Sequence, residues 1–479
     1  MESNVRAAGL ALALVFTIYA LFRRREIPTL VFVLFGPLTY FSQNFGIVLS
    51  PAKLIGLVFV GFILLNTKYI SYLSNRYLGN FLAYYVYTII LTLIMGLIWP
   101  EQTVEAQGFF YGTTMRGFVQ IAQVIMGLAV VIMILSGLTS AHSLFRVQFA
   151  LLLSMTLISI YGLYVWFAQR TGLPFNPITR GFGGLNPPEL QRVITAYVDG
   201  FRMARAYSVN GEPKMLALYA SFGVILTYFT AANRSRLFGG LRGRLVLIPL
   251  FLVTLYLTFS TAGYLVLPMI LLVALVCAVS VGQVSQGIVS SLAVFCIVAL
   301  LVAFFSEHGL SGLVGKVTTV LETRVASRIA AEGLFTYAET AMVEFWTDSP
   351  YFVITGVGLG GSSFYVRLYD TESYAGFVAA PRGIIGFIGD RGLIGLSLFG
   401  SALFKTSKVL VAAATSKSPN RAIYAGVLVI CLVNGVFLLT FSLWYTEWLT
   451  VGLACSAATL AEREFRTVRT PTSAQTAYR

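Results

Sequence analysis

Residues 117–139 read GFVQIAQVIMGLAVVIMILSGLT, and none of them is charged. A helix needs about 20 mainly apolar residues to cross the hydrocarbon core of a bilayer, so this run can form one span. Comparable runs recur along the chain, near 5–22, 27–41, 51–66, 78–99, 144–168, 214–232, 245–260, 262–282, 287–305, 384–404, 422–441 and 447–461. Because backbone polar groups inside a bilayer need internal partners, we expect an all-α polytopic membrane protein with about 12–14 transmembrane helices.

The composition of the whole chain agrees with this class. Of its 479 residues, 57% are hydrophobic and 11% are charged, and the mean hydropathy is +0.81. Soluble domains carry about a quarter charged residues. These values exclude a water-soluble multidomain enzyme, a disordered protein and a coiled coil.

The net charge of +14 is distributed unevenly along the chain. Six segments hold 18 of the 33 basic residues and 3 of the 19 acidic ones: 23–26, 67–77, 140–146, 233–244, 405–421 and 462–479. Alternation of the predicted spans puts these segments on one side, and cytoplasmic loops are the ones that collect Lys and Arg. The surplus therefore indicates membrane orientation, and binding to nucleic acid is not expected.

The same alternation divides the chain into six parts. The N-terminus and both long loops are expected outside, and the C-terminus inside. The parts are N-terminal transmembrane helices (1–168), a first outer loop (169–213), central transmembrane helices (214–305), a second outer loop (306–383), C-terminal transmembrane helices (384–461) and a cytoplasmic tail (462–479).

The first outer loop contains five arginines and is rich in Pro, Gly and Asn, which favours turns and short helices. Arginine offers a planar set of donors suited to phosphate oxygens, so an anion site near the outer surface is one interpretation. Pairing with Glu189, Asp199 and lipid headgroups is the alternative for most of the five. Arg202 and Arg205 are the strongest functional candidates, because on a helical turn they would share one face.

The second outer loop is long enough for helices of its own. Apolar residues recur at helical spacing between Leu313 and Trp346, which predicts an amphipathic helix lying on the membrane or capping the spans. Within it Arg324, Arg328 and Glu332 fall four residues apart, as a solvated row of ion pairs or as functional groups. The glycines in 356–362, GVGLGGS, permit close backbone approach or sharp turns.

Asp390 and Arg391 lie about two turns inside the next predicted span. Charges at such a depth are costly unless they are paired or face a wet cavity. Pairing with other buried groups and a catalytic pocket open to the outside both remain possible. His142 and His308 are the only histidines, and no spacing of His, Cys, Asp or Glu suggests a metal site.

Several segments together resemble the superfamily of bacterial polysaccharide polymerases and O-antigen ligases. They are 205–213 (RAYSVNGEP), 258–263 (TFSTAG), Arg328 followed by 348–350 (DSP) and 356–360 (GVGLG), and 389–395 (GDRGLIG). Each is weak alone, but their order, spacing and side of the membrane agree across about 200–400. The family's arginine in the second segment is Thr261 here. The ligase histidine is also missing, since Pro381 and Arg382 stand at the aligned positions, and this favours the polymerase branch.

The resemblance implies a fold and a reaction. The fold would be like that of GT-C glycosyltransferases, with two periplasmic loops carrying short amphipathic helices. The protein would polymerise undecaprenyl-pyrophosphate-linked repeat units into O-antigen, capsule or exopolysaccharide on the periplasmic face of the bacterial inner membrane. Its partners would be the lipid-linked donor and acceptor, the bilayer and a chain-length regulator protein. An O-antigen ligase-type transferase and a lipid-linked oligosaccharide transporter are the alternatives.

The chemistry implied by the family assigns roles to individual residues. An acceptor hydroxyl attacks the anomeric carbon and the lipid pyrophosphate leaves, so fixed cations at the leaving group stabilise the transition state. Arg205 and Arg328 are the first candidates. Glu339, Asp348 and Asp390 are the possible bases, and the sequence does not choose among them. The expected substrate-binding residues are Arg202, Arg382, Tyr207, Gly358 and Gly360. Neither a metal nor a cofactor is required by this reaction.

Overall fold

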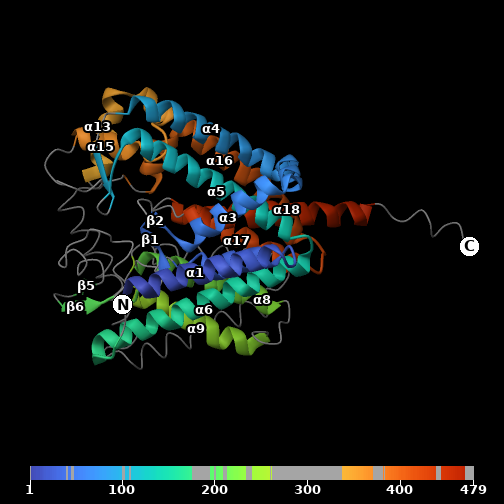
Figure 1. Cartoon of the computed structure of the whole chain (residues 1–479). Helices are drawn as coiled ribbons and strands as arrows, with labels where there is room; N and C mark the ends of the chain where they lie inside the picture. The colour runs from blue at the N-terminus through green and yellow to red at the C-terminus, as the bar shows by residue number, and fades with distance from the viewer. Residues whose placement is uncertain are drawn as a thin grey trace, which may run out of the picture.

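The chain is predominantly helical, as a computed structural model shows (Figure 1). The structure describes residues 2–38, 41–44, 48–99, 103–106, 109–174, 195–198, 201–208, 213–232, 240–258, 260, 337–369, 381, 383–438 and 444–469. The helical class is thereby confirmed.

Helices make up most of the described chain. The first half contains α1 (Glu2–Leu21), α2 (Ile27–Phe35), α3 (Pro51–Leu65), the 3-10 helix η2 (Thr67–Ser74), α4 (Arg76–Ile98), α5 (Thr113–Gly137) and α6 (Ala141–Thr171). The second half contains α8 (Pro213–Ala232), α9 (Gly240–Leu257), α13 (Tyr337–Asp348), α14 (Tyr351–Thr355), α15 (Ser362–Tyr369), α16 (Gly383–Thr415), α17 (Arg421–Leu438) and α18 (Trp444–Arg469).

Several of these helices suggest a membrane-embedded protein. Within the described residues four helices are long and apolar enough to cross a bilayer: Arg76–Ile98, Thr114–Gly137, Ala141–Thr171 and Gly383–Thr415. A fifth span results if α3 and η2, which meet at an angle of 102°, count as one. Shorter apolar helices lie at Arg6–Leu21, Pro213–Phe229, Gly243–Leu257 and Arg421–Gly435. The predicted spans 262–282 and 287–305 lie outside the described residues.

Sequence signals explain where two of the long helices begin. The Asn75 side chain accepts hydrogen bonds from the amides of Tyr77 and Leu78 at the start of α4, and Ser140 and Ser143 form a capping box at the start of α6. Such side chains satisfy amides that have no partner within the first turn. By contrast, α2 spans 9 residues and does not fill the predicted span 27–41.

Three short antiparallel hairpins interrupt the helices. They pair β1 (Gln43–Asn44) with β2 (Val48–Leu49), β3 (Thr103–Ala106) with β4 (Phe109–Gly112), and β5 (Thr195–Val198) with β6 (Phe201–Ala204). The prediction of turns and short helices for the first outer loop is therefore wrong at β5 and β6. Arg202 lies in β6 and Arg205 follows it, so the two do not share a helical face.

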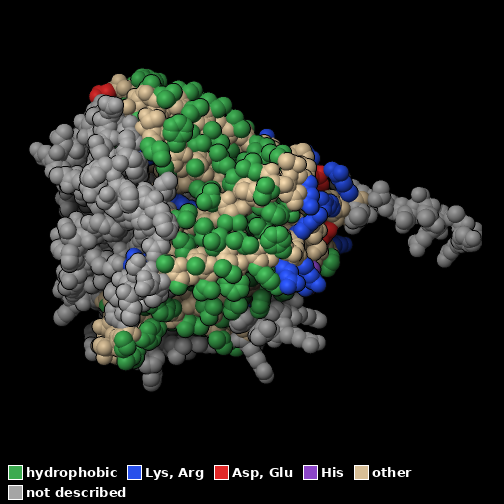
Figure 2. Space-filling model, viewed as in Figure 1, with side chains coloured by type: hydrophobic (Ala, Val, Ile, Leu, Met, Phe, Trp, Pro, Cys, Tyr) green, Lys and Arg blue, Asp and Glu red, His purple; other side chains and the backbone are tan. Residues whose placement is uncertain are grey.

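The two ends of the helical bundle differ in charge. An ion pair joins the turn at 22–26 to the turn at 138–146, and hydrogen bonds join the segment 66–77 and the turn at 416–421 to the last turns of α18. Arg25 and the segment 66–77 line one cavity, and we call these five segments together the basic end. Figure 2 shows Lys and Arg gathered there and apolar side chains along the flank of the helices. The start of α1 lies at the opposite end (Figure 1).

The α18 helix occupies the centre of the bundle. It packs against α4, α5, α16 and α17, and the indole of Trp448 fills the space above Gly127 so closely that a Cβ at Gly127 would overlap it. Inside a membrane, small residues such as glycine let neighbouring helices approach each other closely. At the basic end, Glu462 accepts a hydrogen bond of 3.0 Å from the Tyr77 hydroxyl. These contacts connect α18 to helices that precede it by hundreds of residues.

Candidate functional site

The glycine-rich segment 356–361 docks onto a break in α16. Gly392 has φ 68° and ψ 179°, which interrupts the helix. The amides of Val357 and Gly358 donate to the carbonyls of Gly389 and Asp390, each at 2.9 Å. Carbonyls before a helix break lose their intrahelical donors. The loop amides replace those donors, so loop and break form one unit.

The same loop is held against α4 on its other side. The Leu359 amide donates to Thr92 Oγ1 at 3.0 Å, and the Trp99 indole donates to the Val357 carbonyl at 2.6 Å. Gly358 has φ 84°, and a Cβ there would lie 3.0 Å from the Thr92 Cα. The conformation and the close approach both require glycine at this position. Because its amide bonds to Asp390, the predicted substrate-binding residue Gly358 builds the loop itself.

Asp390 is half-buried and oriented by the residue that follows the loop. Its Oδ1 accepts hydrogen bonds from the Ser362 hydroxyl at 2.7 Å and from the Ser362 amide at 3.3 Å. A carboxylate held in this way has a fixed direction and retains acceptor capacity at its other lone pairs. Asp390 therefore has the geometry of an oriented acceptor at the end opposite the basic end.

Arg116 is a cation at this loop that sequence reasoning missed. Its guanidinium carbon lies 5.4 Å from the ring centroid of Phe364, which is in α15. A Cβ placed on Gly360 would lie 3.1 Å from Arg116 Nε and 3.4 Å from Gln120 Nε2. With φ 73°, Gly360 leaves room for both side chains. The sequence feature that could have indicated Arg116 is its position directly before the apolar run 117–139.

Arg391 faces the interior of the bundle and is buried. Its guanidinium carbon lies 4.4 Å from the centroid of the Phe387 ring, and it interacts electrostatically with Tyr84 and Glu447. The Tyr84 hydroxyl donates to Glu447 Oε1 at 3.4 Å. Of the two predictions for this charge, pairing with buried groups is the one that the structure displays. Asp390 and Arg391 thus have separate environments although they are adjacent.

Arg205 and Tyr207 belong to a second group, at the end of α9. Arg205 is buried, and its Nε donates to the Thr258 carbonyl at 2.8 Å, while the Ala206 amide donates to the Leu257 carbonyl at 2.7 Å. These donors satisfy carbonyls at a helix C-terminus, where a cation is also favoured by the helix dipole. Burial raises the pKa of Tyr207 to about 12, and the neighbouring phenol of Tyr161 adds to the rise.

The predicted site residues do not all come together. Figure 1 shows β6, which leads into Arg205, on the other flank of the molecule from α13 and α15. Glu339 is buried in the first turn of α13 and Asp348 is exposed at its end. Arg202 pairs through its backbone with Tyr197. Arg328 and Arg382 lie outside the described residues. The structure thus gathers Gly358, Gly360, Asp390 and the unpredicted Arg116.

No metal site accompanies this group: among the residues that the structure describes, no three His, Cys, Asp or Glu side chains come together. Comparison with known proteins adds no identification. No protein-family model, curated protein or solved structure matches the chain.

Proposed function

We propose that this protein is a membrane glycosyltransferase that polymerises polyprenyl-pyrophosphate-linked oligosaccharide units at the outer face of the bacterial inner membrane. The observation that carries the proposal is the environment of the glycine-rich loop. An oriented carboxylate, Asp390, bonds to Ser362 just after the loop, and a cation, Arg116, lies beside Gly360 in it, at the end of the bundle away from the basic end. The motifs at 356–360 and 389–395 that resemble the polymerase superfamily meet in this unit.

The reaction assigns Asp390 the role of general base. It accepts the proton of an acceptor hydroxyl as that oxygen attacks the anomeric carbon of the donor sugar. The bond from that carbon to the lipid pyrophosphate breaks, and the pyrophosphate leaves with the electron pair. Attack in line on an α-linked donor inverts the anomeric centre. The half-buried position of Asp390 supports this role, because the carboxylate is both oriented and partly open.

Among the residues that the structure describes, Arg116 is the cation that lies against the loop, and we assign it to the leaving pyrophosphate. Charge develops on that group in the transition state, and a fixed guanidinium offers bidentate hydrogen bonds to it. Arg205 keeps a role in the proposal as a second anion-binding residue. Its Nε donates to the Thr258 carbonyl, which fixes the guanidinium at the end of α9.

A transporter of lipid-linked oligosaccharide is the second candidate. It is favoured by the break of α16 at Gly392 together with the buried charges of Arg391 and Glu447. Broken helices and charges within the span layer are common in transporters. We prefer the transferase because a carboxylate, Asp390, and a cation, Arg116, both lie at the glycine-rich loop.

One reconstitution distinguishes the candidates. The purified protein in detergent receives a polyprenyl-pyrophosphate-linked repeat unit, and the lipid-linked products are separated by size. A polymerase produces a ladder of longer glycans. A transporter yields no product in detergent but moves labelled lipid across the bilayer of vesicles. Transfer to a different acceptor without a ladder identifies a ligase. A folded protein that produces no ladder contradicts the proposal.

A further inference from the structure

A polar cavity lies at the basic end, away from the proposed catalytic loop. It has a volume of about 220 Å³ and is lined by Arg25, Lys68, Tyr69, Ser71 and Tyr72. Arg25 comes from the turn between α1 and α2, and the other four come from η2. Two elements that are separate in sequence therefore form its walls.

The cavity exists because the chain changes direction after α3. The axis of η2 is bent by 102° from that of α3, so η2 runs across the end of the bundle. Hydrogen bonds from the Ser71 hydroxyl to the Lys68 carbonyl, at 2.7 Å, and from Ser74 to Ser71, at 2.6 Å, hold its turns. The ring of Tyr69 lies 5.4 Å from that of Phe62 in α3, which fixes the aromatic wall against the bundle.

The charge of this cavity is positive. Its described lining includes two cations and no carboxylate. Glu26, next to Arg25 in sequence, forms an ion pair with Arg146 and so is engaged elsewhere. Two cations and the phenol hydroxyls of Tyr69 and Tyr72 in one lining match an anion with several oxygens, because ammonium, guanidinium and phenol groups can all donate to it.

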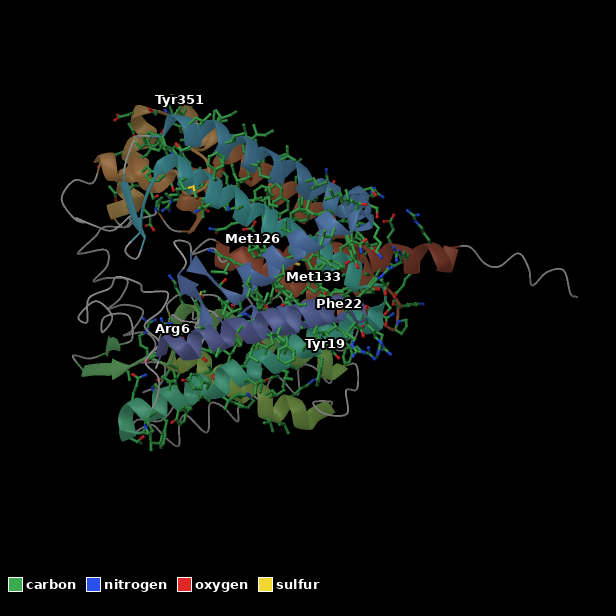
Figure 3. All side chains as sticks on the ribbon, in the orientation of Figure 1. Arg6, Tyr19, Phe22, Met126, Met133 and Tyr351 are labelled. Atoms are coloured by element: carbon green, nitrogen blue, oxygen red, sulfur yellow. The ribbon has the colours of Figure 1, made fainter. Side chains whose placement is uncertain are left out.

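Apolar side chains beside the cavity set its depth relative to the membrane. Phe22 is 81% exposed, Leu64 is 71% exposed and Leu65 is 89% exposed, and they flank the turn and the start of η2. Figure 3 shows Phe22 at this end of α1, well away from Arg6 at the other end. Such side chains are stable in lipid, so the cavity next to them lies at the level of the headgroups.

We propose that this cavity binds the phosphate group of an anionic phospholipid of the leaflet at the basic end. Arg25 and Lys68 contact the phosphate oxygens, Tyr69 and Tyr72 border the headgroup, and the acyl chains lie along Phe22, Leu64 and Leu65. This inference does not depend on the proposed enzymatic activity. It adds a lipid site to a face where the basic residues otherwise indicate only orientation.

The test measures lipid binding to the purified full-length protein. The protein in detergent is titrated with phosphatidylglycerol, and the apparent Kd of the first bound lipid is obtained by native mass spectrometry. Phosphatidylcholine and inorganic phosphate are the comparison ligands. The variants are Arg25→Gln, Lys68→Gln and, as a control with the same loss of charge one residue away, Arg24→Gln. Circular dichroism verifies that each variant retains its helices.

The proposal predicts a specific pattern. Arg25→Gln and Lys68→Gln each weaken phosphatidylglycerol binding about five-fold, which corresponds to one lost cation at a membrane surface. Arg24→Gln leaves the Kd unchanged, and phosphatidylcholine binds more weakly than phosphatidylglycerol.

Equal weakening by all three variants would overturn the site in favour of diffuse attraction. Inorganic phosphate that competes at similar concentration would overturn the lipid assignment in favour of a soluble anion. If Arg25→Gln and Lys68→Gln are folded and bind normally, the site is wrong.

Discussion

Asp390 and Arg391 are neighbours in sequence, yet Asp390 accepts from Ser362 near the surface and Arg391 is buried with Glu447 and Tyr84. The sequence predicted that both charges need partners or water, because isolated charges in a span are costly. It could not identify Glu447, whose proximity depends on how α18 packs against α16.

Replacing Asp390 tests the base. We expect Asp390→Asn to lower the rate of glycan polymerisation by about 10²–10⁴-fold, because the amide cannot accept the proton of the acceptor hydroxyl. The measurement is the initial rate of ladder formation in detergent. Glu344→Gln is the control, since it removes the same charge from an exposed position on α13. A rate within two-fold of the wild type in Asp390→Asn would show that another group takes the proton.

Arg205 is expected to affect stability as well as activity. Arg205→Ala removes the Nε donor and leaves the buried Thr258 carbonyl without it, at a cost of about 1–3 kcal/mol. We therefore expect a lower Tm in detergent together with loss of polymer per folded molecule. The Tm is read from intrinsic fluorescence and the polymer from the product ladder. A destabilised variant with normal polymer per folded molecule would limit Arg205 to its structural role.

At the scale of helices and strands, local sequence patterns predicted some elements and missed others. The long apolar runs predicted α4, α5 and α6 well, because a bilayer demands length and apolarity from each span. The hairpin of β5 and β6 was missed although Asp199-Gly200, a pair favoured in tight hairpin turns, stands between its strands. The docking of 356–361 onto α16 has no local signature beyond its glycines, since its partners are over 30 residues away.

The docked loop makes Gly358 sensitive to substitution. Gly358→Ala places a side chain at φ 84° and within 3.0 Å of the Thr92 Cα, and the backbone conformation alone costs about 1–2 kcal/mol. We expect a lower Tm and reduced polymerisation, because Asp390 depends on this loop. Gly400→Ala is the matched control in α16, where a Cβ meets nothing within 4 Å. Equal Tm values for the two variants would contradict the close packing of the loop.

On the scale of the whole molecule, the distribution of Lys and Arg along the sequence predicted which segments lie at the same end of the bundle, and the motifs did not. Sorting Lys and Arg by loop predicted one basic side, and the described structure has a basic end to which five of the six segments contribute, while 233–239 lie outside the described residues. Lipid and the insertion machinery impose this pattern along the sequence, so it can be read there. The residues around Asp390 come from α4, α5, α15 and α16, and no one-dimensional pattern states that those helices converge.

Orientation in the membrane is the corresponding prediction. We expect Glu344→Cys, on α13, to react with a membrane-impermeant maleimide in intact bacterial cells. Lys417→Cys, in the turn between α16 and α17, should react only after the membrane is opened. The wild-type protein is the control for its four native cysteines, of which Cys431 and Cys455 are buried and Cys277 and Cys296 lie outside the described residues. The reverse labelling pattern would place the glycine-rich loop in the cytoplasm and exclude a periplasmic active site.

The central position of α18 has a consequence for biosynthesis. During synthesis α4 and α5 precede α18. In the folded protein Glu447 of α18 accepts a hydrogen bond from Tyr84, and Glu462 accepts one from Tyr77. Trp448 of α18 packs against Gly127 of α5. Until α18 inserts, the nascent bundle has an open seam that exposes Arg391 and small residues. We therefore expect the earlier helices to complete their packing only after α18 has inserted. Substitutions at the α18 interface should then appear first as degradation of newly made protein.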